Sequence, residues 1–246
     1  MRWRNVVLGT LTTLFLWQVL SWLIDQRVFP APAMVISVFF RDIIGDLGRH
    51  LLISSWRVVA AIIVAVIAAA PAGMIMGQSK MINRYFSPVI YIIHPIPKIV
   101  FLPVILVLLG SGDVSKVFLI ALILFFQILV VVRDAAADLR PELINSVRSL
   151  GAGRRALFKY VYFPAALPAV LTALRVSVGT AVAVLFIAES FATTSGLGYY
   201  IIIEAWGALR YPEMFSGVLA MSTLGLGLYF TIDALERKLS PWQSAP

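Results

Sequence analysis

Residues 133–168 have the sequence RDAAADLRPELINSVRSLGAGRRALFKYVYFPAALP. They form the longest polar interruption in a chain that is otherwise mostly hydrocarbon, and they are basic and punctuated by proline and glycine. A helix that crosses a bilayer needs no such segment. We therefore interpret it as a small folded element that another protein can bind.

The rest of the chain has the composition of a membrane protein. Of its 246 residues, 61% are hydrophobic and only 13% are charged, and the mean hydropathy is +0.94. Soluble domains carry about 25% charged residues. We predict an all-α protein that crosses the bilayer several times, because helices satisfy their own backbone in lipid. Cysteine is absent, which excludes disulfides and thiolate metal sites.

Six segments are long and apolar enough to cross about 30 Å of hydrocarbon. They are Val6–Ile24, Leu51–Gly77, Phe86–Leu109, Ser115–Val132, Leu167–Phe191 and Met214–Leu235. A cleaved signal peptide is the alternative for the first segment. Its apolar run is long for that purpose and no small-residue cleavage site follows it, so we expect a retained span.

The positions of lysine and arginine predict the orientation. With the N-terminus inside, twelve of these residues, Arg2 and Arg4 among them, fall in cytoplasmic segments, and five fall on the opposite face. Cytoplasmic loops carry such an excess. Both termini and the 133–166 segment are therefore predicted to be cytoplasmic. The net charge of +8 is explained by these loops, and no nucleic-acid partner is expected.

An amphipathic stretch follows Pro30-Ala31-Pro32, between the first two spans. Its apolar residues recur at helical spacing: Ile36, Phe39, Phe40, Ile43, Ile44 and Leu47. This pattern predicts a helix that lies along the outer membrane interface or packs on other spans.

The third span contains Pro95, Pro97 and Pro103, with Lys98 beside them. Proline removes backbone hydrogen bonds and kinks a helix. Broken backbone at membrane depth persists only where it is buried in protein or lines a cavity. We predict that this span forms the wall of a pathway; the alternative is a kinked helix buried in the bundle.

The 133–168 segment carries the signals of a short helix. Pro141 suits a first helical turn and Gly151 suits the position just past a helix end. Glu142 near the start and Arg148 near the end both interact favourably with the helix dipole. These signals predict a cytoplasmic helix over Pro141–Leu150.

This short helix has an apolar stripe, formed by Leu143, Val147 and Leu150 at helical spacing. A second short helix, Arg154–Phe163, is expected to stop near Pro164. Neither helix is long enough to span a bilayer.

The segment resembles the EAA loop of permease subunits of bacterial ATP-binding-cassette (ABC) importers. That pattern places a glycine three residues after a Glu-Ala-Ala triplet, and a hydrophobic-x-Leu-Pro ending nine residues later. Here Gly151 stands at the glycine, and Val161, Phe163 and Pro164 form the ending. Asn145-Ser146-Val147 replaces the triplet, so individual triplet contacts do not carry over.

Most of the chain resembles the nitrate/sulfonate/taurine class of these permeases. The matching segments are Phe29-Pro30-Ala31-Pro32, Ser55-Trp56-Arg57-Val58, Pro95-Ile96-Pro97-Lys98, Ala188-Glu189, Ser195-Gly196-Leu197-Gly198-Tyr199, and Leu235-Glu236-Arg237 with Pro241-Trp242. In the fourth span, Phe126-Gln127 stands where the class often has Phe-Pro, so that span is expected to be straighter.

The resemblance implies a type I ABC-importer permease fold: one transmembrane domain over residues 1–246, with about six transmembrane helices. Its parts would be an N-terminal span with an outer amphipathic helix (1–50), core spans (51–235), a cytoplasmic coupling loop (133–166) and a cytoplasmic tail (236–246). It also implies a bacterial inner (plasma) membrane location, a second permease copy forming a homodimer, and contact with membrane lipid. Separate ABC ATPase subunits and an external substrate-binding protein would complete the assembly.

ATP hydrolysis is expected on the ATPase partner, where ATP and Mg would bind. The chain has no G-x-x-x-x-G-K-[ST] loop, and we expect neither a cofactor, a metal nor enzyme activity of its own. Gly225-Leu226-Gly227 is expected to serve close helix packing.

Three groups of residues are expected to carry function. For ATPase coupling they are Glu142, Leu143, Val147, Arg148, Leu150 and Gly151. For the translocation path they are Lys98, Gln127, Arg175 and Glu189, since polar and ionisable residues at depth mark pathways. For the outer gate or docking of the binding protein they are Ser195, Gly196 and Tyr199. Lys98, near mid-depth, is the strongest candidate for attracting an anion, whereas Arg57 and Arg175 are expected to snorkel or pair.

An ATP-independent secondary transporter or channel is the alternative function; it explains the spans but not the spacing of the 133–168 segment. An intramembrane enzyme is disfavoured, because His50 and His94 are the only histidines and form no catalytic motif. Nitrate, sulfonates, taurine, bicarbonate and vitamin precursors all suit the resemblance as cargo, and we expect a small anionic solute of the nitrate, sulfonate or taurine kind.

Overall fold

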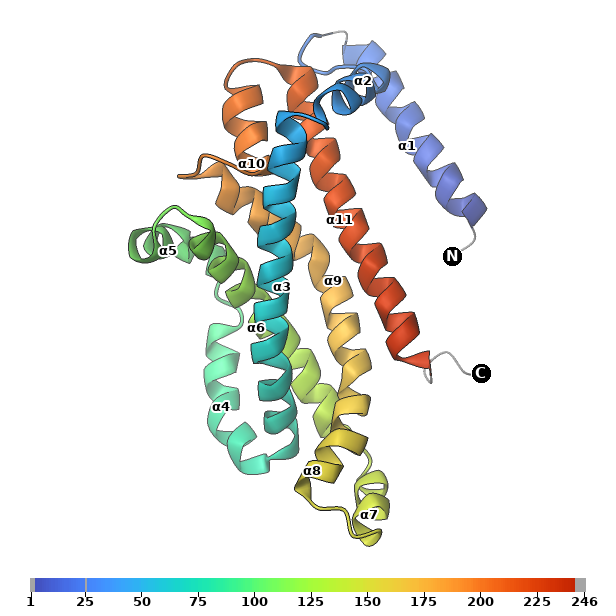
Figure 1. Cartoon of the computed structure of the whole chain (residues 1–246), viewed down its shortest axis with the longest axis vertical. Helices are drawn as coiled ribbons and strands as arrows, with labels where there is room; N and C mark the ends of the chain where they lie inside the picture. Colours follow the sequence, from blue (N-terminus) through green and yellow to red (C-terminus); the bar gives the residue numbers. More distant parts are fainter. Residues whose placement is uncertain (1–2, 25, 242–246) are drawn as a thin grey trace. The chain divides into compact units, whose positions relative to one another are not determined.

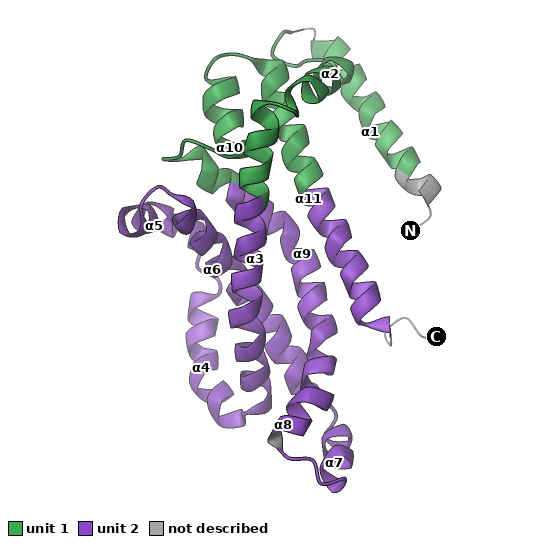
Figure 2. Ribbon diagram, viewed as in Figure 1, with its two compact units in different colours: residues 1–55, 186–224 green, residues 56–185, 225–246 purple. Residues whose placement is uncertain are grey.

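The computed structural model describes residues 3–24 and 26–241. Arg2 and Trp242, which entered the predictions above, lie outside these ranges. The described residues contain helices and no strand. They form two compact units, residues 1–55 with 186–224, and residues 56–185 with 225–246 (Figure 2).

The elements follow one another as α-helices, with a 3-10 turn (η1) and two π-helical stretches (η2, η3) (Figure 1). In chain order they are α1 Trp3–Ile24, α2 Pro32–Asp42, α3 Asp46–Gln78, α4 Lys80–Ile93, η1 Lys98–Phe101, α5 Leu102–Leu109, α6 Asp113–Ala137, α7 Pro141–Ser149, α8 Arg154–Leu157, η2 Phe158–Tyr162, α9 Phe163–Ser190, α10 Leu197–Tyr199, η3 Tyr200–Trp206 and α11 Tyr211–Leu239. Five helical runs are long and apolar enough to cross a membrane, and α4 with η1–α5 makes a sixth if that bent pair is one span. This agrees with the six spans expected.

In the first unit, α2 is shorter than its periodicity suggested. The residues of α2 that are buried are Pro32, Val35 and Val38. α2 ends at Asp42, a turn occupies residues 43–45, and the fully buried Leu47 belongs to α3. Phe40 and Ile44 are exposed. The prediction of one amphipathic helix through Leu47 was therefore wrong, because the turn at residues 43–45 ends α2 and separates Leu47 from it.

In the second unit, α3 and α6 pack backbone to backbone. Gly73 and Gly77 lie one turn apart on α3, and a Cβ on either would press against the backbone of α6, including the carbonyl of Arg133 at Gly77. Small residues four apart permit such close approach. A Cβ on Gly227 would meet no described atom within 4 Å, and one on Gly225 would make only an ordinary contact. Close packing at that pair is therefore not seen against the residues that the structure describes, and it stays a prediction.

The third span is broken into two helices. α4 ends at Ile93 and η1 begins at Lys98, with a bend of 78° between the two parts. Pro95 and Pro97 lie in this break, whereas Pro103 lies in the first turn of α5, where proline is tolerated. α5 has eight residues, or about 12 Å, so it cannot cross a bilayer alone. The fourth span, α6, runs without a break, as expected of a segment without proline.

The fifth span starts earlier than expected. A single helical run extends from Arg155 to Ser190, so the prediction that a separate helix stops near Pro164 was wrong. Proline cannot donate to the carbonyl four residues earlier. The residues just before it, Phe158–Tyr162, form a π-helix, whose wider turn accommodates the missing bond.

Candidate functional site

α7 is a nine-residue helix that ends in a Schellman motif. Gly151 follows it with φ +81°, a left-handed conformation that favours glycine. The Gly151 N–H donates to the Arg148 carbonyl (2.9 Å) and the Ala152 N–H donates to the Val147 carbonyl (3.4 Å), the two bonds of this motif. The predicted place of Gly151 is confirmed. Leu150 is the C-cap rather than the last helical residue.

The apolar stripe of α7 is not covered by any residue that the structure describes. No residue of α7 is buried, and Leu143 and Leu150 are 45% and 85% exposed. Val147 is half-buried. Within its unit, α7 lies at the tip beyond the end of α6 and packs on α8 and η2 (Figure 1). A short helix is marginal by itself, and an accessible apolar stripe on such a helix suits insertion into a groove of another protein.

Lys98 caps the end of α4. Its side chain is largely buried, and its Nζ donates to the backbone carbonyls of Ile93 (3.1 Å) and His94 (3.0 Å). It also lies 4.6 Å from the centre of the Phe126 ring. The last carbonyls of a helix have no intrahelical partner and attract cations. The ammonium therefore stabilises the break in the third span, and its role in attracting an anion stays a prediction.

Two arginines on the spans of the second unit are paired with carboxylates. Arg175 lies 3.2 Å from Asp233 and 3.0 Å from Glu236, which ties α9 to α11. Arg57, 2% exposed, donates to Asp113 at 2.9 and 2.6 Å. Of the two alternatives expected for these arginines, pairing is the one observed.

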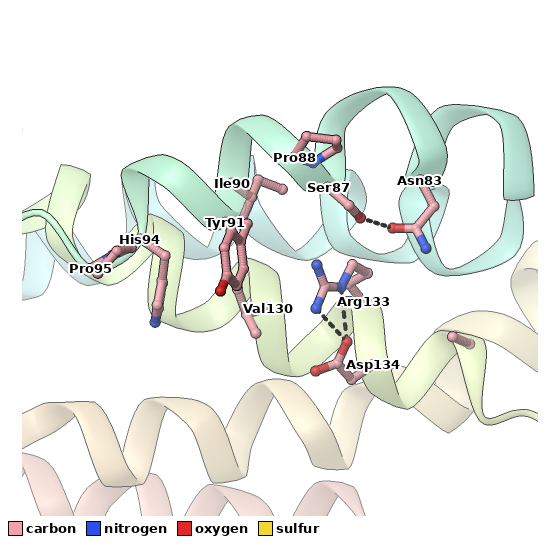
Figure 3. Close-up of a pocket in the computed structure, with 11 residues that line it drawn as sticks. Asn83, Ser87, Pro88, Ile90, Tyr91, His94, Pro95, Val130, Arg133 and Asp134 are labelled. Carbon is pink, nitrogen blue, oxygen red and sulfur yellow. Dashed lines mark hydrogen bonds and ion pairs between the residues drawn. The ribbon is translucent and has the colours of Figure 1, made fainter.

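A cavity of about 810 Å³ lies between α4 and α6. Its polar and aromatic lining comprises Asn83, Ser87, Tyr91, His94, Arg133 and Asp134 (Figure 3). Arg133 is paired with Asp134 at 2.8 Å, and the Ser87 hydroxyl donates to Asn83 at 2.6 Å. The polar groups of this wall are thus largely satisfied by one another.

A second cavity, of about 330 Å³, lies between α6 and α9 and shares His94 and Val130 with the first. We call it the α6–α9 cavity. Gln127, predicted to lie on the path, lines it, and its buried Oε1 has no hydrogen-bond partner among the described residues. Gln127 therefore faces a cavity, whereas Lys98 and Arg175 are engaged as described above.

Glu189 is fully buried in the first unit. The Ser54 Oγ lies 2.9 and 2.8 Å from its two carboxylate oxygens, and the Gly198 N–H donates to Oε2 at 3.1 Å. The Leu197 N–H donates to the Ser54 Oγ at 2.8 Å. The first N–H groups of a helix need such acceptors. Glu189 and Ser54 together cap the start of α10.

The loop before α10 is held by a histidine. Gly196 has φ +108°, and its N–H donates to the Nδ1 of His50 at 2.9 Å. The other ring nitrogen of His50 lies 3.4 Å from Glu204, and the ring lies 6.0 Å from that of Tyr199. The carbonyl of Ser195 accepts from Thr193. The structure thus brings Glu189 together with the residues predicted for the outer gate.

Two residues of the first unit have displaced pKa values. Burial raises the pKa of Tyr200. Hydrogen bonds to Asp42 and Glu213 raise the pKa of Arg41 above its ordinary value. Arg41 therefore stays charged, and it joins α2 to α11 through Glu213 at 3.1 Å.

A protein-family model matches residues 61–244: the binding-protein-dependent transport system inner membrane component. The chain belongs to this family. It is thus a multi-pass inner-membrane permease, and the resemblance drawn from the 133–168 segment is confirmed at the level of the family.

Curated relatives of this permease share nearly its whole length. It is 31% identical to the taurine transport system permease protein TauC of Escherichia coli, over 98% of this chain and 92% of that protein. It is 28% identical to the putative aliphatic sulfonates transport permease protein SsuC of Bacillus subtilis, over 99% of this chain and 89% of that protein. It is 24% identical to the nitrate import permease protein NrtB of Synechococcus elongatus, over 93% of this chain and 86% of that protein.

A solved structure shares the fold of this permease. A chain of the MetNI methionine ABC transporter, in an inward-facing conformation, matches with a TM-score of 0.66. The match covers 78% of this chain and 95% of that one at 18% identity. This likeness concerns the fold alone, and it confirms the type I ABC-importer permease fold.

Sequence reasoning missed the polar anchors of the loop before α10. His50 and Ser54 stand at i and i+4 in an otherwise apolar stretch of α3, a spacing that places both on one helix face and that was visible in the sequence. Gly73 and Gly77 form a G-x-x-x-G pair, a known signal of close helix packing. Their partners on other helices are distant in sequence, so the signals could not name them.

Proposed function

We propose that this permease forms, as a pair of identical copies, the alternating-access path of an ATP-driven importer for a small anionic solute. The relatives that share its length are named for taurine, aliphatic sulfonates and nitrate. These compounds have in common a small oxyanion group. That shared chemistry supports a solute of the same class here.

The observation that carries the proposal is the uncovered apolar stripe of α7. ATPase subunits, which would hold ATP and Mg, supply the groove that receives it. α7 packs on α8 and η2, and these continue into α9 as one helical run. A push on α7 would therefore reach the fifth span without passing through a flexible joint. Glu142, Leu143, Val147, Arg148, Leu150 and Gly151 would form or position this contact.

On the outer side, a binding protein delivers the solute. Ser195, Gly196 and Tyr199 would contribute to the outer gate or to the docking face, with both chain termini in the cytoplasm. The capping of this loop by His50, Ser54 and Glu189 supports a gate element that holds a defined shape. An ATP-independent transporter would leave the α7 stripe without a partner.

Reconstitution tests this function directly. Proteoliposomes would contain the permease alone, the permease with its cognate ATPase, or the permease with an ATPase that cannot hydrolyse ATP. Each preparation would receive the binding protein outside and ATP inside, with labelled taurine and methanesulfonate as substrates. We expect uptake only with the active ATPase and the binding protein. Equal uptake by the permease alone would contradict the proposal.

A further inference from the structure

Polar side chains on the spans of the second unit mostly use their hydrogen-bonding groups within the chain. The engaged pairs are Arg57 with Asp113, Lys98 with backbone carbonyls, Ser115 with the Gly112 carbonyl, Thr172 with Glu236, and Arg175 with Asp233. This is expected, because an unsatisfied polar group in hydrocarbon costs several kcal/mol.

Four side chains that line the α6–α9 cavity do not follow this pattern. The Oε1 of Gln127 is buried without a partner. The hydroxyls of Ser177 and Thr180 and the ring of His94 make no hydrogen bond with any residue that the structure describes. Ser177 is buried as well. The His94 ring projects from the end of α4 (Figure 3).

We infer that the α6–α9 cavity is a substrate site that holds an oxyanion through the hydrogen-bond donors of His94, Gln127, Ser177 and Thr180. The inference rests on the proposed function and deepens it by naming the contact residues and the kind of recognition. Unused hydrogen-bonding groups on one wall at membrane depth indicate a polar ligand. The Gln127 Oε1 can only accept, so the carboxamide NH₂ of this residue, and not its oxygen, would meet the oxyanion.

The chemistry of the wall fits an oxyanion. A hydroxyl, a carboxamide NH₂ and an imidazole N–H each donate to an oxygen acceptor, and a sulfonate or nitrate offers three such oxygens. The residues that line the cavity include no carboxylate that would repel an anion. The volume of about 330 Å³ compares with ~30 Å³ for one water molecule, so a small sulfonate fits with part of its hydration.

Fixed cations do not contribute to this site. Lys98 donates to backbone carbonyls, and Arg175 is paired with Asp233 and Glu236. A site without lysine or arginine holds an anion weakly, and weak binding suits a pathway because the solute must leave as well as enter. Selection among anions would therefore depend on the number and placement of acceptor oxygens, not on charge.

The two histidines of the chain permit a direct measurement without ATPase or binding protein. The permease would be labelled with ¹⁵N-histidine, placed in lipid nanodiscs, and titrated with sodium methanesulfonate and sodium nitrate. Sodium chloride at equal ionic strength is the control, and His94→Gln assigns the signals. We expect the imidazole signals of His94 to shift and saturate with a Kd on the order of millimolar. The signals of His50, in the other unit, should stay in place.

A double variant tests the hydroxyls. Ser177→Ala with Thr180→Val should raise the Kd about tenfold or more, since each lost hydrogen bond costs roughly 1 kcal/mol. Thr180→Ser, which keeps its hydroxyl, should bind like the wild type. The matched control is Ser222→Ala with Thr231→Val, whose hydroxyls donate to carbonyls of their own helix. An unfolding temperature equal to that of the wild type in each variant reports that the fold is intact.

Three results would overturn the site: a His94 shift of equal size with chloride, an unchanged Kd in the double variant, or an equal loss in the control variant. ATP-driven uptake by the same variants separates the site from the proposed function. Wild-type protein that takes up substrate without an ATPase contradicts the importer, whatever the titration shows. If the double variant takes up substrate at the rate and with the selectivity of the wild type, the substrate site is contradicted and the importer function is not.

Discussion

At the scale of single residues, Gly151 has a backbone conformation that other residues adopt only at a cost. Valine in the left-handed region costs roughly 1–2 kcal/mol, and Gly151 has φ +81°. We expect Gly151→Val to alter the exit from α7, so that ATP hydrolysis continues while uptake falls several-fold. The ratio of ATP hydrolysed to substrate imported measures this uncoupling. Gly153→Val is the matched control, because the φ angle of Gly153 is not positive. Normal coupling of hydrolysis to uptake in Gly151→Val would refute the role of Gly151 in coupling.

Lys98 is the residue for which sequence and structure suggest different roles. The capping of α4 by its ammonium predicts that Lys98→Ala loses ~2 kcal/mol of stability, because hydrogen bonds from a charged group are strong. The sequence-based hypothesis predicts that uptake of an anion falls more than ATPase association. Thermal unfolding in detergent and uptake by the reconstituted complex separate the two. Lys159→Ala, which removes an exposed lysine, is the control, and an unchanged unfolding temperature in Lys98→Ala would contradict the cap.

Glu189 accepts hydrogen bonds at both carboxylate oxygens. In Glu189→Gln one of these acceptors becomes an NH₂ donor that faces the Ser54 hydroxyl or the Gly198 N–H. We expect faster hydrogen exchange at residues 196–198, by about tenfold for a loss of ~1.4 kcal/mol. Glu213→Gln changes a carboxylate of the same unit that pairs with the exposed Arg41, and it should leave this exchange unchanged. Equal protection in both variants would show that Glu189 does not hold the loop.

At the scale of secondary-structure elements, the contact between α3 and α6 depends on two glycines. A side chain at Gly77 would overlap the backbone of α6, and overpacking typically costs 1–3 kcal/mol or more. We expect Gly77→Leu to lower the unfolding temperature and the yield of folded protein in detergent. Gly227→Leu adds the same side chain where no described atom lies within 4 Å. Similar losses in the two variants would mean that lipid insertion, and not this contact, is affected.

The elements also show which structural features local sequence patterns can predict. Hydropathy located the spans, and Pro141 and Gly151 located α7, because both signals depend on local sequence. The stop expected at Pro164 did not occur, since a π-helical turn at Phe158–Tyr162 accommodates the proline. The 78° break was expected only as a kink. Proline indicates where backbone bonds are lost, and the surrounding packing decides how the chain responds.

At the scale of the whole molecule, the family and the fold were predictable because the order and spacing of many short segments agree with one another. The contacts of the candidate sites were less predictable. Glu189 and Arg175 were identified as polar residues at depth, yet their partners Ser54 and Asp233 lie 135 and 58 positions away. A single sequence does not reveal such distant pairs, whereas it does reveal helix ends and apolar stripes.

The engagement of Lys98 and Arg175 by groups of their own chain has an electrical consequence. If no unmatched fixed cation lies beside the solute, the membrane potential acts on the full charge of the solute, at about 2.3 kcal/mol per charge per 100 mV. An inside-negative potential should then slow the import of methanesulfonate. Taurine, a zwitterion without net charge, should be unaffected. Initial uptake rates in proteoliposomes clamped with potassium and valinomycin compare the two. Equal voltage dependence for both solutes would show that charge of the protein moves with the cargo.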